Sequence, residues 1–160
     1  MGGMEADNVS RYVERAVELA VANVADGGGP FGAVVRMPDG SVFEGTNRVT
    51  RDNDPTAHAE VVAIRRAAAG SRTFDLRGAV LYSSCEPCPL CLAASLWAHV
   101  ARVYFAADRH DAAAVGFDDA RFYEYFDGVD HTLMPVNHSP VAKRSAPFEA
   151  WTAFGGRVKY

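Results

Sequence analysis

Two short stretches decide what this chain becomes, namely Pro55-Thr56-Ala57-His58-Ala59-Glu60 and Cys85-Glu86-Pro87-Cys88-Pro89-Leu90-Cys91. Cys88 and Cys91 are three residues apart, so on a helix both thiols lie on one face and can hold the same metal ion. His58 adds an imidazole, which completes three ligands of the kind that zinc prefers. A structural zinc site fills four positions with protein, whereas a catalytic site keeps one for water. The spacing therefore predicts a catalytic centre with one Zn²⁺ per chain and one catalytic water.

Glu60 is the predicted proton carrier of this centre. It lies two residues after His58, within reach of the water and of a bound substrate. On a regular helix, residues two apart point to opposite sides. The prediction therefore requires both side chains to turn toward a common point from the first helical turn. We expect Thr56 or Asp54 to cap this helix, which should continue to Ala69.

Cys85 leaves two other kinds of metal site open. With Cys88 and Cys91 it forms a C-x-x-C-x-x-C run like that of some iron–sulfur proteins, but such a cluster needs a fourth Cys and the chain has three. A closed zinc site of three Cys and His58 is the stronger alternative, and it would leave Glu60 without a role. We expect Cys85 to be a small buried residue in the loop before the second metal-bearing helix.

The composition is that of one soluble globular domain. The chain has 160 residues, of which 49% are hydrophobic and 22% charged, so we expect a single domain over residues 1–160. No apolar run approaches the length of a membrane span, and residues 1–5 lack the features of a signal peptide. Three Cys, two of them predicted ligands, favour a reducing compartment, the cytoplasm. The net charge of −4 argues against a nucleic-acid partner.

Alternating helices and strands predict an α/β fold, a three-layer α/β/α arrangement with a five-stranded mixed sheet between helices. Pro38-Asp39-Gly40 is typical of a hairpin turn. The predicted strands are residues 32–37, 42–46, 79–83, 103–106 and 133–136. Besides the helix that follows His58, the predicted helices are residues 10–24, 88–98, 119–126 and 147–154. Metal sites in such folds usually lie where strands end and helices begin.

The chain resembles the bacterial guanine deaminases of the cytidine-deaminase fold over nearly its whole length. The zinc segments are shared by the whole superfamily, whose signature is His-x-Glu followed by Pro-Cys-x-x-Cys. More selective are Gly116-Phe117-Asp118-Asp119 and the tail, with Ser145-Ala146-Pro147-Phe148-Glu149-Ala150-Trp151 and Tyr160. The resemblance implies a zinc hydrolase of purine metabolism that converts guanine to xanthine and ammonia, with Glu60 as the catalytic acid and base.

The resemblance also implies roles for five substrate-binding residues. Asn47 would hydrogen-bond the base, Asp119 would accept a ring N–H of guanine, and Phe31 and Trp97 would form aromatic walls. From the sequence alone, Asn47 is equally typical of a turn, Asp119 of a helix cap and Trp97 of a core. The bacterial family forms homodimers, which implies that the segment of about residues 140–160 crosses to the partner and that Tyr160 completes the partner's site.

Two other functions remain open. A deaminase of tRNA adenosine, of guanosine or cytidine, or of an aminated triazine would share the zinc residues. The tRNA alternative predicts a basic surface, against which the net charge argues, and a nucleoside needs room for ribose that a closing tail would occupy. The second alternative is a zinc-stapled binding module without catalysis. We favour a small-molecule purine base as the partner, with neither a nucleic acid nor a membrane.

Overall fold

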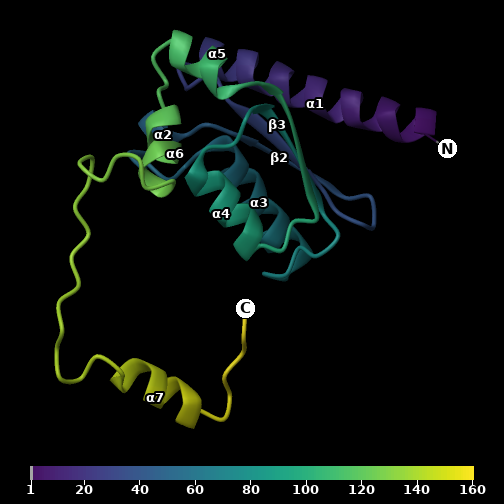
Figure 1. The fold of residues 1–160 in the computed structure, drawn as a ribbon. Helices are drawn as coiled ribbons and strands as arrows, with labels where there is room; N and C mark the ends of the chain where they lie inside the picture. Colours follow the sequence, from purple (N-terminus) through teal and green to yellow (C-terminus); the bar gives the residue numbers. More distant parts are fainter. Residues whose placement is uncertain (1) are drawn as a thin grey trace.

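The computed structural model describes residues 2–160, with side chains from residue 5 onward. Its elements, labelled in Figure 1, are α1 (Gly2–Ala25), β1 (Gly32–Arg36), β2 (Val42–Thr46), α2 (Val49–Asp52), α3 (Ala59–Ser71), β3 (Val80–Cys85), α4 (Pro89–Trp97), β4 (Arg102–Ala107), α5 (Arg109–Ala114), α6 (Ala120–Phe126) and α7 (Ala146–Ala153).

The described strands form one mixed sheet in the order β2-β1-β3-β4. β1 pairs antiparallel with both β2 and β3, and β3 pairs parallel with β4. The predicted hairpin of β1 and β2 is confirmed, and its turn is closed by Asp39, whose carboxylate accepts hydrogen bonds from the backbone N–H and the hydroxyl of Ser41 at 2.9 and 2.6 Å. The α/β class is thus confirmed.

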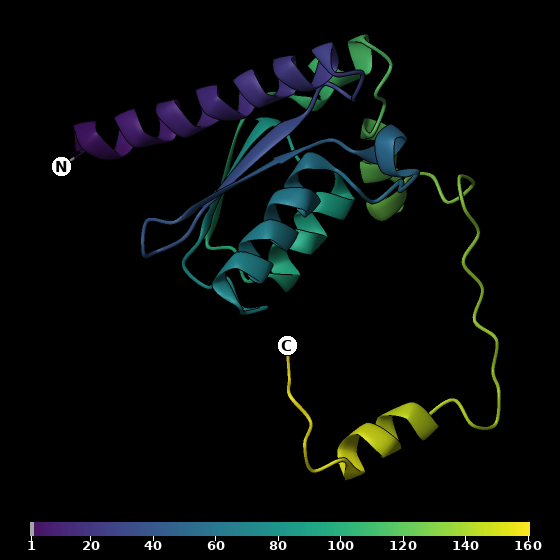
Figure 2. The ribbon, with the colours of Figure 1, turned by 180° about the vertical axis from the view of Figure 1, so that it is seen from behind.

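Helices cover both faces of the sheet because its residues alternate in direction. Ala33 and Val35 of β1 pack in a core with the buried alanines of α3. Val34, between them, packs with Tyr82 of β3 and Ala16 of α1 in a second core. Figures 1 and 2 show α1 along one face and α3 with α4 along the other.

Two glycines let the helices approach the sheet closely. A β-carbon at Gly32 would lie 2.3 Å from the carbonyl oxygen of Ala16 in α1. A β-carbon at Gly45 would lie 2.3 Å from the carbonyl oxygen of Ala59 and 2.5 Å from the backbone nitrogen of Ala63. The second contact fixes the first turns of α3 against β2, and α3 begins directly after His58.

The prediction of a fifth strand over residues 133–136 is wrong, so the described sheet has four strands rather than five. These residues are exposed, irregular backbone between α6 and α7. Pro135 lacks the N–H that a strand needs for its ladder, and the segment runs away from the sheet in Figure 1. The predictions also missed two short helices, α2 and α5, and α1 begins earlier than predicted.

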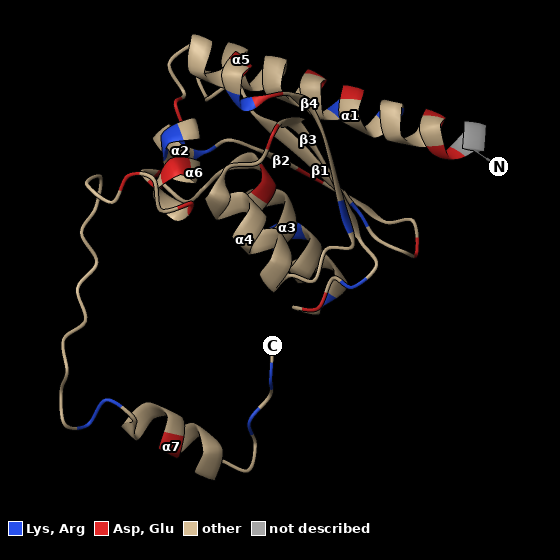
Figure 3. Cartoon of the chain, viewed as in Figure 1, with Lys and Arg blue, Asp and Glu red and all other residues tan. Residues whose placement is uncertain are grey.

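The last part of the chain lies apart from the sheet. Every residue from 131 to 160 is exposed, and an extended segment connects α6 to α7 in both views (Figures 1 and 2). Glu149 is the one charged residue of α7, while basic residues flank the helix (Figure 3). Among the described residues, no helix has both the length and the apolar character needed to cross a membrane.

Candidate active site and metal centre

His58, Cys88 and Cys91 meet where the first turns of α3 and α4 come together beyond the end of β3. The Nδ1 atom of His58 lies 3.4 Å from the Sγ atom of each cysteine, and the two Sγ atoms are 3.7 Å apart. The ligand atoms of these three residues all lie within 4.8 Å of one another. We call these three residues the ligand triad.

The triad fits a tetrahedral zinc ion. Zn–S bonds of about 2.3 Å and Zn–N bonds of about 2.0 Å place two thiolates about 3.8 Å apart and a thiolate about 3.5 Å from an imidazole nitrogen. The observed separations of 3.7 and 3.4 Å are close to both values. Three protein ligands are the number found in catalytic zinc sites, in which the fourth position takes water or substrate.

Two of the ligands stand immediately before a helix. His58 is the N-cap of α3, with φ −67° and ψ 153°, and Cys88 is the N-cap of α4, with φ −67° and ψ 168°. Because His58 has extended backbone, it is not bound by the helical rule that separates residues two apart, and its side chain turns to the same side as that of Glu60. Helix N-termini also stabilise thiolates through their unpaired N–H groups.

The prediction that Thr56 or Asp54 caps α3 is wrong. Asp54 instead accepts hydrogen bonds from the backbone N–H and the hydroxyl of Thr56, at 2.8 and 2.6 Å, in a turn before the helix. His58 occupies the cap position without a side-chain cap bond. The imidazole is therefore available to the metal.

The contacts within the triad shift the pKa values of its three residues. The contact between the two sulfur atoms, together with His58, lowers the pKa of Cys88 to about 4. The same contact, with burial, raises the pKa of Cys91. The contact with Cys88 in turn raises the pKa of His58. Zinc binds the thiolate form of cysteine, so metal binding releases thiol protons.

Cys85 lies outside the triad. Its Sγ atom is 3.7 Å from the carbonyl oxygen of Asp108, and burial raises its pKa to about 11. The described residues whose ligand atoms gather within 4.8 Å of one another are His58, Cys88 and Cys91, and Cys85 is not among them. The arrangement therefore favours the three-ligand site over the closed alternative of three Cys and His58.

Glu60 is buried beside the triad, where a proton carrier should be. The hydroxyl of Ser83 in β3 donates to its Oε1 atom at 3.0 Å, and the Cys91 thiol lies 3.4 Å from its Oε2 atom. Burial raises the pKa of Glu60 above its ordinary value. The role of Ser83 could not be predicted from the sequence, because in a strand of buried residues nothing marks one hydroxyl as a partner of a distant carboxylate.

Asn47 follows β2 and is fixed on several sides. Its Oδ1 atom accepts from the backbone N–H of Val49 at 3.2 Å, which is the turn role. Its carbonyl accepts from the side chain of Asn23 at 2.9 Å, and Asn23 also donates to the carbonyl of Gly29 at 2.8 Å. Asn23, a buried residue of α1 that the sequence analysis missed, thus holds the glycine-rich loop against Asn47.

Asp119 precedes α6 but does not cap it with its side chain. Among the described residues, its Oδ1 is the single buried side-chain oxygen or nitrogen atom without a hydrogen-bond partner. Burial, followed by the negative charge of Cys88, raises the pKa of Asp119. A buried acceptor without a partner is costly in a folded protein, so Asp119 is a candidate for binding a ligand near the triad.

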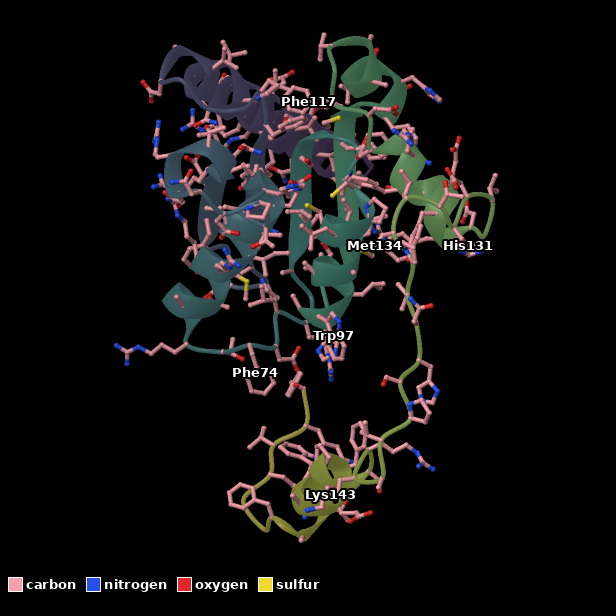
Figure 4. The ribbon with its side chains drawn as sticks, turned by 90° about the vertical axis from the view of Figure 1, so that its left-hand side faces the viewer. Phe74, Trp97, Phe117, His131, Met134 and Lys143 are labelled. Carbon is pink, nitrogen blue, oxygen red and sulfur yellow. The ribbon has the colours of Figure 1, made fainter. Side chains whose placement is uncertain are left out.

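The predicted aromatic residues fall into two groups. Phe31 makes an edge-to-face contact with Phe117, with ring centres 5.0 Å apart, and its carbonyl accepts from the backbone N–H of Asn47. Trp97 lies at the far end of α4, 65% exposed, with its ring centre 5.8 Å from that of Tyr160. Figure 4 shows Phe117 and Trp97 at opposite ends of the body. Within one chain, the structure does not bring Trp97 and Tyr160 to the triad.

Comparison with known proteins agrees with this geometry. Residues 6–107 match the cytidine and deoxycytidylate deaminase zinc-binding region. A guanine deaminase from Bacillus subtilis (strain 168) is 43% identical over 155 residues, which cover 96% of this chain and 99% of that protein. The solved structure of guanine deaminase from Bacillus subtilis has a TM-score of 0.89 and 44% identity, and the match covers 94% of this chain and 98% of that chain.

Two further relatives differ in what they act on. A solved guanine deaminase from Nitrosomonas europaea has a TM-score of 0.63 and 36% identity, over 68% of this chain and 63% of that chain. A tRNA-specific adenosine deaminase from Haemophilus influenzae is 36% identical over 130 residues, 79% of this chain and 71% of that protein. The matched region 6–107 includes the whole triad and Glu60. The chain therefore belongs to the family of cytidine and deoxycytidylate deaminases with a zinc-binding region.

Proposed function

We propose that this protein hydrolyses guanine to xanthine and ammonia with one zinc ion per chain. The observation that carries the proposal is Asp119, a half-buried carboxylate near Cys88 of the triad whose buried Oδ1 atom has no hydrogen-bond partner. The similarity over nearly the full length to a guanine deaminase supports the same substrate.

His58, Cys88 and Cys91 would hold the zinc, which when bound lowers the pKa of water and so supplies a nucleophile at neutral pH. Glu60 takes the proton of the attacking water and passes it to a ring nitrogen next to the amine-bearing carbon. After the attack, Glu60 takes the remaining proton from the added hydroxyl group and delivers it to the amine, which leaves as ammonia while the carbonyl group of xanthine forms. Ser83 fixes one oxygen of Glu60, and the other oxygen faces Cys91 and the triad. For one carboxylate to perform both transfers, the water and the base must both bind within hydrogen-bond reach of Glu60.

Asp119 and Asn47 would recognise the base. Guanine carries a ring N–H beside its carbonyl group, and the Asp119 carboxylate can accept that hydrogen. Adenine has no N–H at this position, so it would leave the buried oxygen unpaired, which can reduce reactivity by several orders of magnitude. The Asn47 side chain supplies an amide donor, since its Oδ1 atom is already used by Val49. Phe31 and Phe117 would provide an apolar wall.

Ammonia release from a panel of substrates tests this function. The panel comprises guanine, guanosine, adenine, adenosine, cytosine and cytidine, each with the wild type and with Glu60→Gln. We expect the wild type to prefer guanine and Glu60→Gln to retain zinc with nearly all turnover lost. A preference for adenosine or cytidine would contradict the substrate, and an active Glu60→Gln enzyme would contradict the mechanism. Release from none of the six would favour a zinc-stapled binding module.

We also propose that the protein is a homodimer of single-domain chains, residues 1–160, that acts in the cytoplasm. The segment of about residues 140–160 would cross to the partner, and Tyr160 would complete the partner's site, with Trp97 beside it. The support is the exposure of Phe148, Trp151 and Phe154, which are 72%, 40% and 61% exposed in one chain. Exposed apolar patches of this kind mark interaction surfaces. Helices on both faces of the sheet support a three-layer α/β/α arrangement for each domain.

A further inference from the structure

Asp119 is carried by a helix that hydrophobic packing does not hold. None of the residues of α6 is buried. A carboxylate that recognises a substrate by a hydrogen bond must nevertheless be held in position to within about half an ångström. Phe117 anchors the loop before Asp119 through its contact with Phe31. A second anchor is needed on the other side, within α6 itself.

Tyr123 supplies that anchor. It lies four residues after Asp119, about one helical turn along the same face. Its hydroxyl donates a hydrogen bond to the carbonyl oxygen of Pro87. Pro87 immediately precedes Cys88, so a single contact connects the helix of Asp119 to a ligand of the triad.

Arg109 of α5 holds the tyrosine ring in this orientation. Its guanidinium carbon lies 3.5 Å from the centre of the Tyr123 ring, a cation–π contact. Its Nε atom donates to the Glu86 carboxylate at 2.7 Å. Both residues of this ion pair are half-buried or nearly buried, with side chains 32% and 16% exposed. The Glu86-Pro87 pair before the first zinc-binding cysteine is therefore clamped to both α5 and α6.

We propose that Tyr123 is a positioning residue that sets the place of Asp119 relative to the triad and thereby the selectivity for guanine. The inference rests on the proposed function. The Pro87 contact connects α6 rigidly to the loop that carries Cys88. The distance between the Asp119 carboxylate and the triad is therefore kept constant. The hydroxyl donates to the Pro87 carbonyl group rather than to a ligand of the triad, so Tyr123 acts through Asp119.

Tyr123→Phe tests the proposal, and the same helix offers a matched control. The hydroxyl of the half-buried Tyr125 also donates to a backbone carbonyl, that of Met134, at 2.9 Å, in a hydrogen bond exposed to solvent. Tyr123→Phe should raise KM for guanine about tenfold with kcat changed less than about twofold, as expected for lost uniform binding. Tyr125→Phe should leave both constants unchanged.

Binding without turnover gives an independent measure. In the Glu60→Gln background, titration calorimetry with 8-azaguanine should show about the same tenfold weakening for Tyr123→Phe. Zinc content and melting temperature should equal those of the Tyr125→Phe control. Arg109→Met keeps the tyrosine hydroxyl but removes the clamp, and it should raise KM by a smaller factor, about threefold.

A double-mutant cycle separates positioning from simple destabilisation. If Tyr123 acts through Asp119, then Tyr123→Phe should cause no further rise in KM when Asp119→Asn is already present. Two results would overturn the inference while leaving the proposed function intact: equal kinetics of Tyr123→Phe and Tyr125→Phe, or full additivity of Tyr123→Phe with Asp119→Asn. A wild type that does not deaminate guanine would instead overturn the proposed function, and this inference with it.

Discussion

Ser83 and Ser84 are adjacent in β3, and their hydroxyls serve different partners. Ser83 donates to Glu60, whereas Ser84 accepts from the backbone N–H of Gly32 at 3.0 Å. Ser83→Ala should lower kcat about tenfold with unchanged zinc content, because Glu60 loses the donor that orients it. Ser84→Ala should leave kcat nearly unchanged and cost about 1–3 kcal/mol of stability, because a buried N–H loses its partner. Steady-state kinetics and denaturant unfolding of both variants distinguish the two roles, and a reversed pattern would contradict this assignment.

Cys85 and Cys88 should respond differently to substitution with alanine. Cys85→Ala should keep one zinc per chain, since the Cys85 thiol lies against the Asp108 carbonyl group and outside the triad. Cys88→Ala should lose zinc and activity, because two ligands do not suffice for a stable site. Metal analysis after dialysis measures both outcomes. Loss of zinc from Cys85→Ala would instead support the closed zinc site, in which three Cys and His58 are the ligands.

For single residues, the sequence predicts the site where the residue types and their separation along the chain define a known kind of metal site. The ligands and Glu60 could be predicted because their residue types and separations are restrictive. Ser83, Asn23 and Tyr123 could not, because each acts through a contact with a residue far away in the chain. Their partners become known only when β3, α1 and α6 are placed around the zinc loop.

Among the secondary-structure elements, α3 depends most on a single small residue. Gly45→Ala would place a β-carbon 2.3 Å from the Ala59 carbonyl oxygen and so push the start of α3 away from β2. We expect a loss of about 1–3 kcal/mol and weaker zinc binding, because His58 and Glu60 begin this helix. Thermal unfolding and a competitive zinc titration measure the two effects. Gly155→Ala, at a position with no neighbouring atom within 4 Å, is the matched control and should change neither.

The predicted elements succeeded where local patterns agree with tertiary packing. The hairpin of β1 and β2 has both a turn signal and a buried partner in β3. Residues 133–136 have apolar side chains and no such partner, and Pro135 further weakens their pairing. The short helix α5 was missed although Asp108 and Asp111 form a capping box around its start. Six residues are too few for a helical period to be visible in the sequence.

For the whole molecule, the proposed exchange of tails predicts complementation between two defective chains. Glu60→Gln lacks the proton carrier, and Tyr160→Ala lacks the residue proposed to complete the partner's site. Each alone should be nearly inactive. Unfolded together in equal amounts and refolded, they should recover about a quarter of wild-type activity, since half of the dimers are mixed and each mixed dimer has one intact site.

The activity of the refolded mixture, compared with each variant refolded alone, measures this recovery. A mixture no more active than its components would show that Tyr160 acts within its own chain. The sequence could suggest such a tail only through family resemblance. Its aromatic residues are equally compatible with an ordinary core, and their exposure becomes evident only once α7 is seen apart from the sheet (Figure 2).

The extended segment between α6 and α7 has a further consequence if the tails are exchanged. The catalytic power of each chain would then depend on how many chains are present, because no chain completes its own site. Dilution below the dissociation constant of the dimer would lower the specific activity, whereas a self-sufficient enzyme keeps its activity per chain at any concentration. The protein would thus have almost no activity at low concentration, and its total activity would rise more steeply than its concentration.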